Sequence, residues 1–183
     1  MLPESRLVAE LLLKHPTLEQ WDTALVRENL LQKKPATAVR QARLIRKRLE
    51  TLDDEGLRLV IDGDSELAGQ ILMAASARNS QLLSDFMRDV YAVDLRQLEK
   101  TLSYRHWEAF LADCAHRDGT IDGWAASTRK KIFQVIARIL AEAKYLDSTR
   151  HMKLTPPLLH PRVRRYLRRL GDDTTLARME VTT

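Results

Sequence analysis

The stretch QKKPATAVRQARLIRKRLE, residues 32–50, combines an apolar seam with a dense run of positive charge. On a helical wheel at about 100° per residue, its apolar side chains and one from the next turn fall within a stripe roughly 80° wide. The stripe consists of Ala38, Ala42, Ile45, Leu49 and Leu52. Arg40, Arg43 and Lys47 fall on the opposite side. The sequence therefore predicts an amphipathic helix with a buried seam and a cationic outer face.

The residues before this helix predict another helix and a short turn. Thr17 and Gln20 form a capping-box pattern, which starts a helix expected to run to about residue 32. Pro35 and Thr37 then interrupt the chain, with Thr37 as the expected cap of the basic helix. A helix, a short turn and a basic helix form the arrangement of a helix-turn-helix, whose second helix enters the major groove of DNA. We predict such an element over about residues 18–52.

A second element of the same kind is predicted over about residues 104–145. A glycine-containing break, RDGTIDGW at residues 117–124, precedes the amphipathic segment RKKIFQVIARILAEAKYL at residues 129–146, for which Ser127 is the expected cap. The apolar face expected to be buried comprises Ile132, Val135, Ile136, Ile139 and Leu140. Arg129, Lys130 and Lys131 occupy the first turn, where they oppose the helix dipole. Contact with phosphate would explain their position.

A third basic segment lies near the C-terminus. Pro161 suits the first turn of a helix that we expect to stop near Gly171. The basic residues of this helix are Arg162, Arg164, Arg165, Arg168 and Arg169. They would contact the phosphate backbone or dock onto an acidic segment of this chain or of a partner. Helical periodicity without strict alternation predicts one all-α, compact multi-helix domain over residues 1–170, followed by a flexible tail over residues 171–183.

Charge is unevenly distributed along the 183 residues, whose net charge is +5. Residues 1–50 hold ten basic and six acidic side chains, residues 51–126 hold seven and fourteen, and residues 127–170 hold twelve and two. Two basic regions therefore flank an acidic middle. This polarity favours a polyanion, above all nucleic acid, as the partner. Pairing of the basic helices with the acidic middle is the alternative.

Other function classes find little support in the sequence. The longest apolar runs, such as LVAELLL at residues 7–13, are far shorter than the roughly 18 residues that span a bilayer. The opening MLPESRL has no basic n-region, and the single cysteine, Cys114, cannot form an internal disulfide, so we expect a cytoplasmic protein. Glycine-rich phosphate-binding motifs are absent, so we expect no nucleotide cofactor.

The segment DCAHRD, residues 113–118, is the best candidate for metal binding or acid–base chemistry. Its side chains Asp113, His116 and Asp118 lie near Glu108 and Asp122 in the sequence. The spacing matches no defined site, so we predict neither a metal site nor a catalytic residue. The three tryptophans lie at helical spacing among apolar neighbours, which favours core packing over stacking on unpaired bases.

Three blocks of the chain resemble, in the same order, the BrxA family of small accessory proteins of BREX bacteriophage-exclusion systems. The blocks are ENLLQKKPATAVRQARLIRKRLETL at residues 28–52, LLSDFMRDVY at residues 82–91 and RKKIFQVIARILAEAKYLDS at residues 129–148. HPTLEQW and PPLLHP extend the likeness over most of the chain. One departure is Lys144, which stands where the family pattern has a glycine before Tyr145.

The resemblance implies an all-helical domain, partly similar to the RNA-binding antitermination protein NusB, with two helix-turn-helix elements and positive surface between them. It also implies binding of double-stranded DNA in a phage-defence setting. By this likeness, Lys33, Lys34, Arg40, Arg43 and Lys47 belong to the first element. Arg129, Lys130 and Lys131 belong to the second.

Together these patterns predict a non-enzymatic accessory protein that binds double-stranded DNA with low sequence specificity, with other BREX proteins as further partners. We expect a monomer, because no heptad seam persists beyond about two turns. The predicted DNA-contacting residues are Lys33, Lys34, Arg40, Arg43, Arg46, Lys47, Arg129, Lys130, Lys131, Arg162, Arg164, Arg165, Arg168 and Arg169. Two alternatives are a scaffold whose basic faces dock an acidic protein, and RNA binding as in NusB-like proteins.

Overall fold

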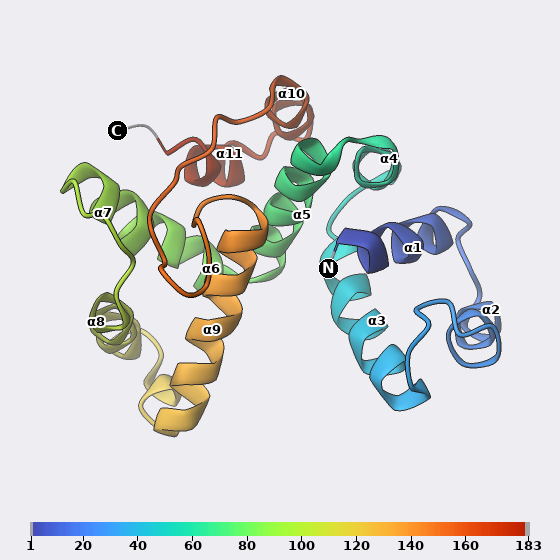
Figure 1. Cartoon of the computed structure of the whole chain (residues 1–183), viewed down its shortest axis with the longest axis horizontal. Coiled ribbons are helices and arrows are strands. Elements are labelled where there is room, and N and C mark those ends of the chain that lie inside the picture. The colour runs from blue at the N-terminus through green and yellow to red at the C-terminus, as the bar shows by residue number, and fades with distance from the viewer. Residues whose placement is uncertain (1, 182–183) are drawn as a thin grey trace.

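The computed structural model describes residues 2–181, which form helices joined by short connections (Figure 1). The N-terminal elements are α1 Leu2–Leu13, α2 Leu18–Asp22, the π-helical turn η1 Thr23–Arg27, α3 Pro35–Leu49, α4 Asp54–Asp62 and α5 Ser65–Asn79. The elements that follow are α6 Gln81–Phe86, the π-helical turn η2 Met87–Tyr91, α7 Ala92–Arg96, α8 Tyr104–Ala115, the 3-10 turn η3 Gly119–Ile121, α9 Ala126–Glu142, α10 Pro161–Arg169 and α11 Asp173–Met179. Within residues 2–181, β pairing is limited to isolated bridges. The predicted all-α fold is confirmed.

Helix α5 lies at the centre of the fold because it is apolar on almost every side. Asp64 begins the helix by accepting a hydrogen bond of 2.8 Å from the Leu67 N–H. Its buried residues are Leu67, Ala68, Gln70, Ile71, Met73, Ala74, Ala75, Ser76 and Ala77. A helix with so little polar surface must be enclosed by others. Helices α1, α3, α4, α6, α9, α10 and α11 pack against it.

The first predicted helix pair is present, with different boundaries. Thr17 and Gln20 make both hydrogen bonds of the predicted capping box, at 3.2 and 2.8 Å. The helix that they start ends at Arg27, short of residue 32, because Asn29 and Gln32 take left-handed backbone conformations that turn the chain. Helix α3 begins at Pro35, whose fixed φ and missing N–H suit the first helical position. The expected cap Thr37 is therefore inside the helix.

The predicted seam of α3 is confirmed, whereas that of α9 is rotated. Ala38, Ala42, Ile45 and Leu49 are buried in α3, as is the following Leu52. In α9 the buried residues are Phe133, Ile136, Ala137 and Leu140, while Val135 is 44% exposed. Helix α9 also begins at Ala126, so the predicted cap Ser127 lies in its first turn.

The chain after Gly171 differs from the predicted tail. Asp172 accepts a hydrogen bond of 3.0 Å from the Thr175 N–H and so caps α11. Leu176 and Met179 of this helix are buried, which anchors it to the core. The Tyr145 hydroxyl also donates a hydrogen bond of 2.9 Å to the Met179 carbonyl. A flexible tail is therefore wrong for this helix, and residues 182–183 lie outside the described residues.

Lys144, which departs from the family pattern, has a left-handed backbone with φ of 67°. The Tyr145 N–H donates to the Leu140 carbonyl at 2.8 Å, and the Lys144 N–H donates to the Ala141 carbonyl at 3.2 Å. These two bonds form a Schellman motif at the end of α9, in which the left-handed position is usually glycine. The position thus requires the conformation that glycine adopts without a steric penalty.

We predict that Lys144→Gly stabilises the protein by about 0.5–1 kcal/mol, because glycine relieves the left-handed strain of a side-chain-bearing residue. Urea unfolding followed by circular dichroism measures the difference. Lys144→Ala is the matched control, since it removes the side chain but keeps the Cβ, and it should give little or no stabilisation. Equal effects of the two substitutions would contradict a backbone origin.

Candidate nucleic-acid interface

Helix α3 presents four of the candidate cations to solvent. Lys34, Arg40, Arg43 and Lys47 are exposed, and none has a hydrogen-bond or ion-pair partner through its side chain within residues 2–181. Leu44, which is 55% exposed, lines a shallow hollow together with Arg40 and Arg43. This face therefore offers both mobile cations and an apolar contact, which are the two kinds of group that touch phosphates and base edges.

Two other candidates from the first element have structural partners. The Lys33 ammonium donates a hydrogen bond of 2.8 Å to Glu4, which ties the turn before α3 to α1 and lowers the pKa of the Glu4 carboxyl. Arg46 donates to Glu50 at 2.6 Å, and its guanidinium lies 4.5 Å from the centroid of the Trp21 ring. Lys33 thus fastens the first element to α1, and Arg46 joins α3 to α2 through Trp21.

Helix α9 exposes Lys130 and Lys131, again without a side-chain partner within the described part of the chain. Arg129, in contrast, turns back onto the loop before the helix. Its guanidinium donates to the Trp124 carbonyl at 3.2 Å and to the Asp122 carbonyl at 3.3 Å. The next two contacts fasten the same turn to α8: Arg129 pairs with Glu108 at 3.4 Å, and the Trp107 indole donates to the Arg129 carbonyl at 3.2 Å. Arg129 is thus a structural residue of the turn.

The N-termini of α3 and α9 lack the side-chain caps that other helices have. The residues at their N-cap positions, Lys34 and Ala125, make no capping hydrogen bond. Helices α4, α5 and α8 are capped by the side chains of Asp53, Asp64 and Ser103. Pro35 has no N–H, and the Thr37 and Thr128 N–H groups donate to the carbonyls of the preceding N-cap residues. The N–H groups left open to water or to an anion at these two ends are those of Ala36 in α3 and of Ala126 and Ser127 in α9, and the helix dipole adds positive potential there.

The arginines of α10 form two groups: some pair with carboxylates of the protein, and the others are exposed to solvent. Arg164 pairs with Glu180, and Arg169 pairs with Asp53 and, at 2.8 Å, with Glu55. These pairs fasten α10 to the segment after α11 and to the start of α4. The remaining arginines of this helix are exposed and have no side-chain partner within residues 2–181: Arg162, Arg165 and Arg168.

The N-terminal ends of α3 and α9 lie apart from each other on one side of the molecule, and α10 lies on the opposite side (Figure 1). In Figure 1, α3 and α9 diverge below α5, with the N-terminal end of α3 at the lower right of the view and that of α9 at the lower left. Helix α10 lies at the top of the same view. The two uncapped helix ends therefore face the same side of the molecule, and α10 faces the opposite side.

Comparison with known proteins places this arrangement in one family. The family model described as BrxA matches residues 1–171. This chain belongs to the BrxA family. The BREX protein BrxA of Paramagnetospirillum magneticum is 35% identical over 182 residues, covering 99% of this chain and 92% of that protein. The BREX protein BrxA of Escherichia coli is 32% identical over 181 residues, covering 98% and 85%.

A solved structure shares the fold of this BrxA-family chain. The crystal structure of an uncharacterized protein from Magnetospirillum magneticum superposes with a TM-score of 0.91 at 33% sequence identity. It covers 99% of this chain and 93% of that one. The whole helical arrangement, including α11, therefore has a counterpart in a protein with two thirds of its residues different.

The other candidates from the sequence of this BrxA-family chain have structural roles or lack, among the described residues, the neighbouring ligands that a metal site needs. Asp118 caps η3, where bonds from Thr120 lower the pKa of its carboxyl. Within residues 2–181, no three His, Cys, Asp or Glu side chains are grouped as metal ligands. Trp21 and Trp107 are buried, so they pack in the core. None of the helices in the described region is both long and apolar enough to cross a membrane.

We predict that Arg129→Gln lowers the free energy of unfolding of this BrxA-family protein by about 1–3 kcal/mol, because it leaves the partly buried Trp124 carbonyl without its donor and removes the ion pair with Glu108. Lys130→Gln and Lys131→Gln, which alter exposed side chains on the same turn, should change it by no more than about 0.5 kcal/mol. Urea unfolding compares the three variants. If Arg129→Gln left the free energy of unfolding unchanged, this would show that the arginine is free for a ligand.

A further prediction concerns the pH dependence of the contact between α10 and α4. Burial raises the pKa of the Asp53 carboxyl, but hydrogen bonds from Arg169 and the Gly56 N–H outweigh burial and leave this pKa below its ordinary value. Its stabilising contribution is therefore complete above the unfolded-state pKa, near 3.9, and is lost as the pH falls through the lower folded-state value.

Asp53→Asn keeps a good helix cap but removes the charge. Its destabilisation should be largest between about pH 5 and 7 and should shrink below about pH 4, as measured by urea unfolding across this range. Arg169→Gln removes the partner of the same carboxylate. Its destabilisation should likewise decrease below about pH 4. A constant difference at every pH would rule out the ion pair as the cause.

Proposed function

We propose that this chain is a non-enzymatic accessory protein of a BREX phage-exclusion system that binds double-stranded DNA with low sequence specificity. Membership of the BrxA family and the naming of its relatives as BREX proteins support the system. The observation that carries DNA binding is the pair of uncapped, cationic N-termini of α3 and α9, which face one side of the molecule. It acts as a cytoplasmic monomer.

The two helix ends would bind the duplex mainly through its phosphates. Open N–H groups, the helix dipole and mobile Lys and Arg side chains all favour an anionic oxygen. Each basic helix follows a shorter one, in the order that a helix-turn-helix requires. Phosphate contacts position a protein without reading sequence, so binding should be weakly specific. Dissociation constants on the order of 10⁻⁴–10⁻⁶ M at physiological salt are expected for such contacts.

Helix α10 has a secondary place in this proposal. Its free cations Arg162, Arg165 and Arg168 lie away from the ends of α3 and α9. They would add phosphate contacts only on a duplex long enough to pass along the molecule. A dependence of affinity on duplex length is the consequence.

The test is fluorescence anisotropy with a labelled duplex over a salt series, using the triple variant Arg40→Glu, Arg43→Glu, Lys47→Glu. Loss of about three phosphate contacts should weaken binding by at least tenfold near 0.1 M salt. It should also reduce the slope of log affinity against log salt by about 2 to 3. The reason is that each neutralised phosphate releases close to one counterion.

The matched control reverses three other exposed cations, Arg58, Lys100 and Arg150, and so gives the same net charge. It should retain most of the affinity. Equal losses in the two triple variants would show that only net charge matters and would overturn the assignment to α3. Preference for duplex RNA over duplex DNA would favour RNA binding, and absence of binding at low salt would favour a protein-docking scaffold.

A further inference from the structure

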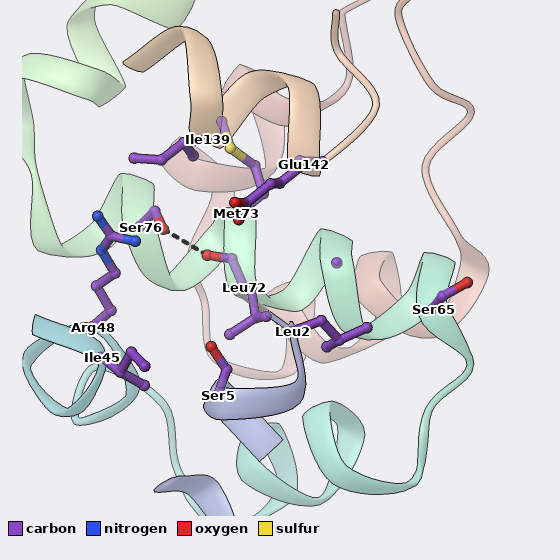
Figure 2. A pocket seen from close by; sticks show the side chains of 12 residues that line it. Leu2, Ser5, Ile45, Arg48, Ser65, Leu72, Met73, Ser76, Ile139 and Glu142 are labelled. Atoms are coloured by element: carbon purple, nitrogen blue, oxygen red, sulfur yellow. Dashed lines mark hydrogen bonds between the residues drawn. The ribbon is translucent and has the colours of Figure 1, made fainter. Parts of the chain in front are cut away.

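A groove runs between α3 and α9, with α5 and α6 beneath it. One hollow of about 420 Å³ and a smaller one of about 150 Å³ adjoin there. They share three lining residues, Arg48 from α3, Ser76 from α5 and Ile139 from α9, so they form one continuous depression. Figure 2 shows the smaller hollow, with the Arg48 side chain extending from α3 toward the labelled residues of α5 and α9.

The wall of the larger hollow is an apolar stripe that no helix of the described chain covers. Ile132, Val135 and Ile139 recur at spacings of three and four residues along α9 and all line it, as does Leu82. Val135 is 44% exposed, although its spacing predicts a buried residue. The stripe extends about 10 Å, which is two turns of helix. It is therefore long enough to pack against a short amphipathic helix.

The charged side chains that line this larger hollow are both cationic, Arg48 and Lys131. Arg48 is only partly exposed, and its side chain has no hydrogen bond or ion pair within residues 2–181. Burial lowers the pKa of its guanidinium, and the charge of Glu142, which lines the smaller hollow, opposes that shift. A partly desolvated guanidinium with five donors and no acceptor has its hydrogen-bonding capacity unused. A carboxylate would satisfy it.

We propose that the groove between α3 and α9 binds an acidic amphipathic helix of a partner protein. The aliphatic side chains of that helix would lie against Ile132, Val135 and Ile139, and one of its carboxylates would accept hydrogen bonds from Arg48. This is the helix-in-groove mode of recognition, in which apolar anchors at helical spacing give affinity and a flanking charge gives orientation.

The chemistry of the walls favours a peptide over nucleic acid at this place. A phosphate backbone gains little from aliphatic side chains, whereas burial of apolar surface is the main source of affinity for an amphipathic helix. The free cations assigned to DNA on α3, Arg40, Arg43 and Lys47, do not line either hollow. Of the residues assigned to DNA, Lys131 alone lines the groove. The groove is thus a second surface, next to the proposed DNA-binding ends.

The first experiment selects peptides from a phage-displayed library of 16-residue random sequences on the full chain. Enriched sequences should carry Leu, Ile, Phe or Met at spacings of three and four residues together with Asp or Glu. A synthetic copy of the most enriched peptide is then titrated by fluorescence anisotropy. Hydrogen–deuterium exchange on the wild type should show protection of residues 76–83 and 128–139 by the same peptide.

Two variants and two matched controls locate the binding. Val135→Glu should weaken peptide binding at least tenfold, and Arg48→Met should weaken it about three- to tenfold, because Met keeps the apolar stem and removes the donors. Val26→Glu and Arg138→Met make the same chemical changes at exposed positions that line neither hollow, and should change affinity less than twofold. Thermal unfolding checks that all four variants fold.

Several results would overturn the proposal. One is a selection without enrichment, and another is an enriched set rich in Lys and Arg. Equal binding of the selected peptide to wild type and Val135→Glu, or exchange protection elsewhere on the chain, would place the peptide outside the groove. Protection of residues 128–139 by duplex DNA, with no peptide bound there, would assign the groove to nucleic acid. Duplex affinity measured on the same variants keeps this outcome separate from the proposed DNA binding.

Discussion

Burial of α5 on nearly all sides is the constraint on which the other helices depend. Its small residues, such as Ala68, Ala74 and Ala75, let neighbouring helices approach closely, and its larger ones fill the spaces between them. Because α3 and α9 pack on this same helix, their orientation relative to each other is set by the core. The two basic helix ends thus face one side of the molecule because of apolar packing and not because of any contact between the charges themselves.

The structure divides the cations into those that hold the fold and those that remain free. Lys33, Arg129 and Arg169 each join segments far apart in the sequence, through Glu4, Glu108 and Asp53. Part of the acidic middle therefore pairs with basic residues, which is one of the two alternatives that the sequence left open. The free cations on α3 and α9 are those for which residues 2–181 provide no carboxylate partner, so their charge remains available to a ligand.

Local sequence patterns predicted most helices and their buried seams. The features that the sequence did not predict depend on tertiary packing. The seam from Ala38 to Leu49 and the capping box at Thr17 follow from sequence because each depends on neighbours within one or two turns. The same spacing rule predicted that Val135 is buried, whereas the structure leaves it 44% exposed. The covered side of α9 is set by packing against α5 and α8, where the Phe133 ring contacts Tyr104 and Trp107. Helix α11 was missed because its burial depends on Tyr145 and the core, although the Asp172 and Thr175 spacing is a capping signal. Likewise, nothing in the sequence distinguishes Arg129 from Lys130.

The N-terminal ends of α3 and α9 are unfavourable for the stability of their own helices. Cations close to a helix N-terminus interact unfavourably with its dipole, and each missing side-chain cap typically costs about 1 kcal/mol. Helices α4, α5 and α8 of the same chain avoid both costs with Asp or Ser caps. Open N–H groups and unpaired cations at the same two ends reinforce each other's potential, and an anion bound there would relieve both penalties together. The local instability of these ends and their suitability for phosphate have the same physical origin.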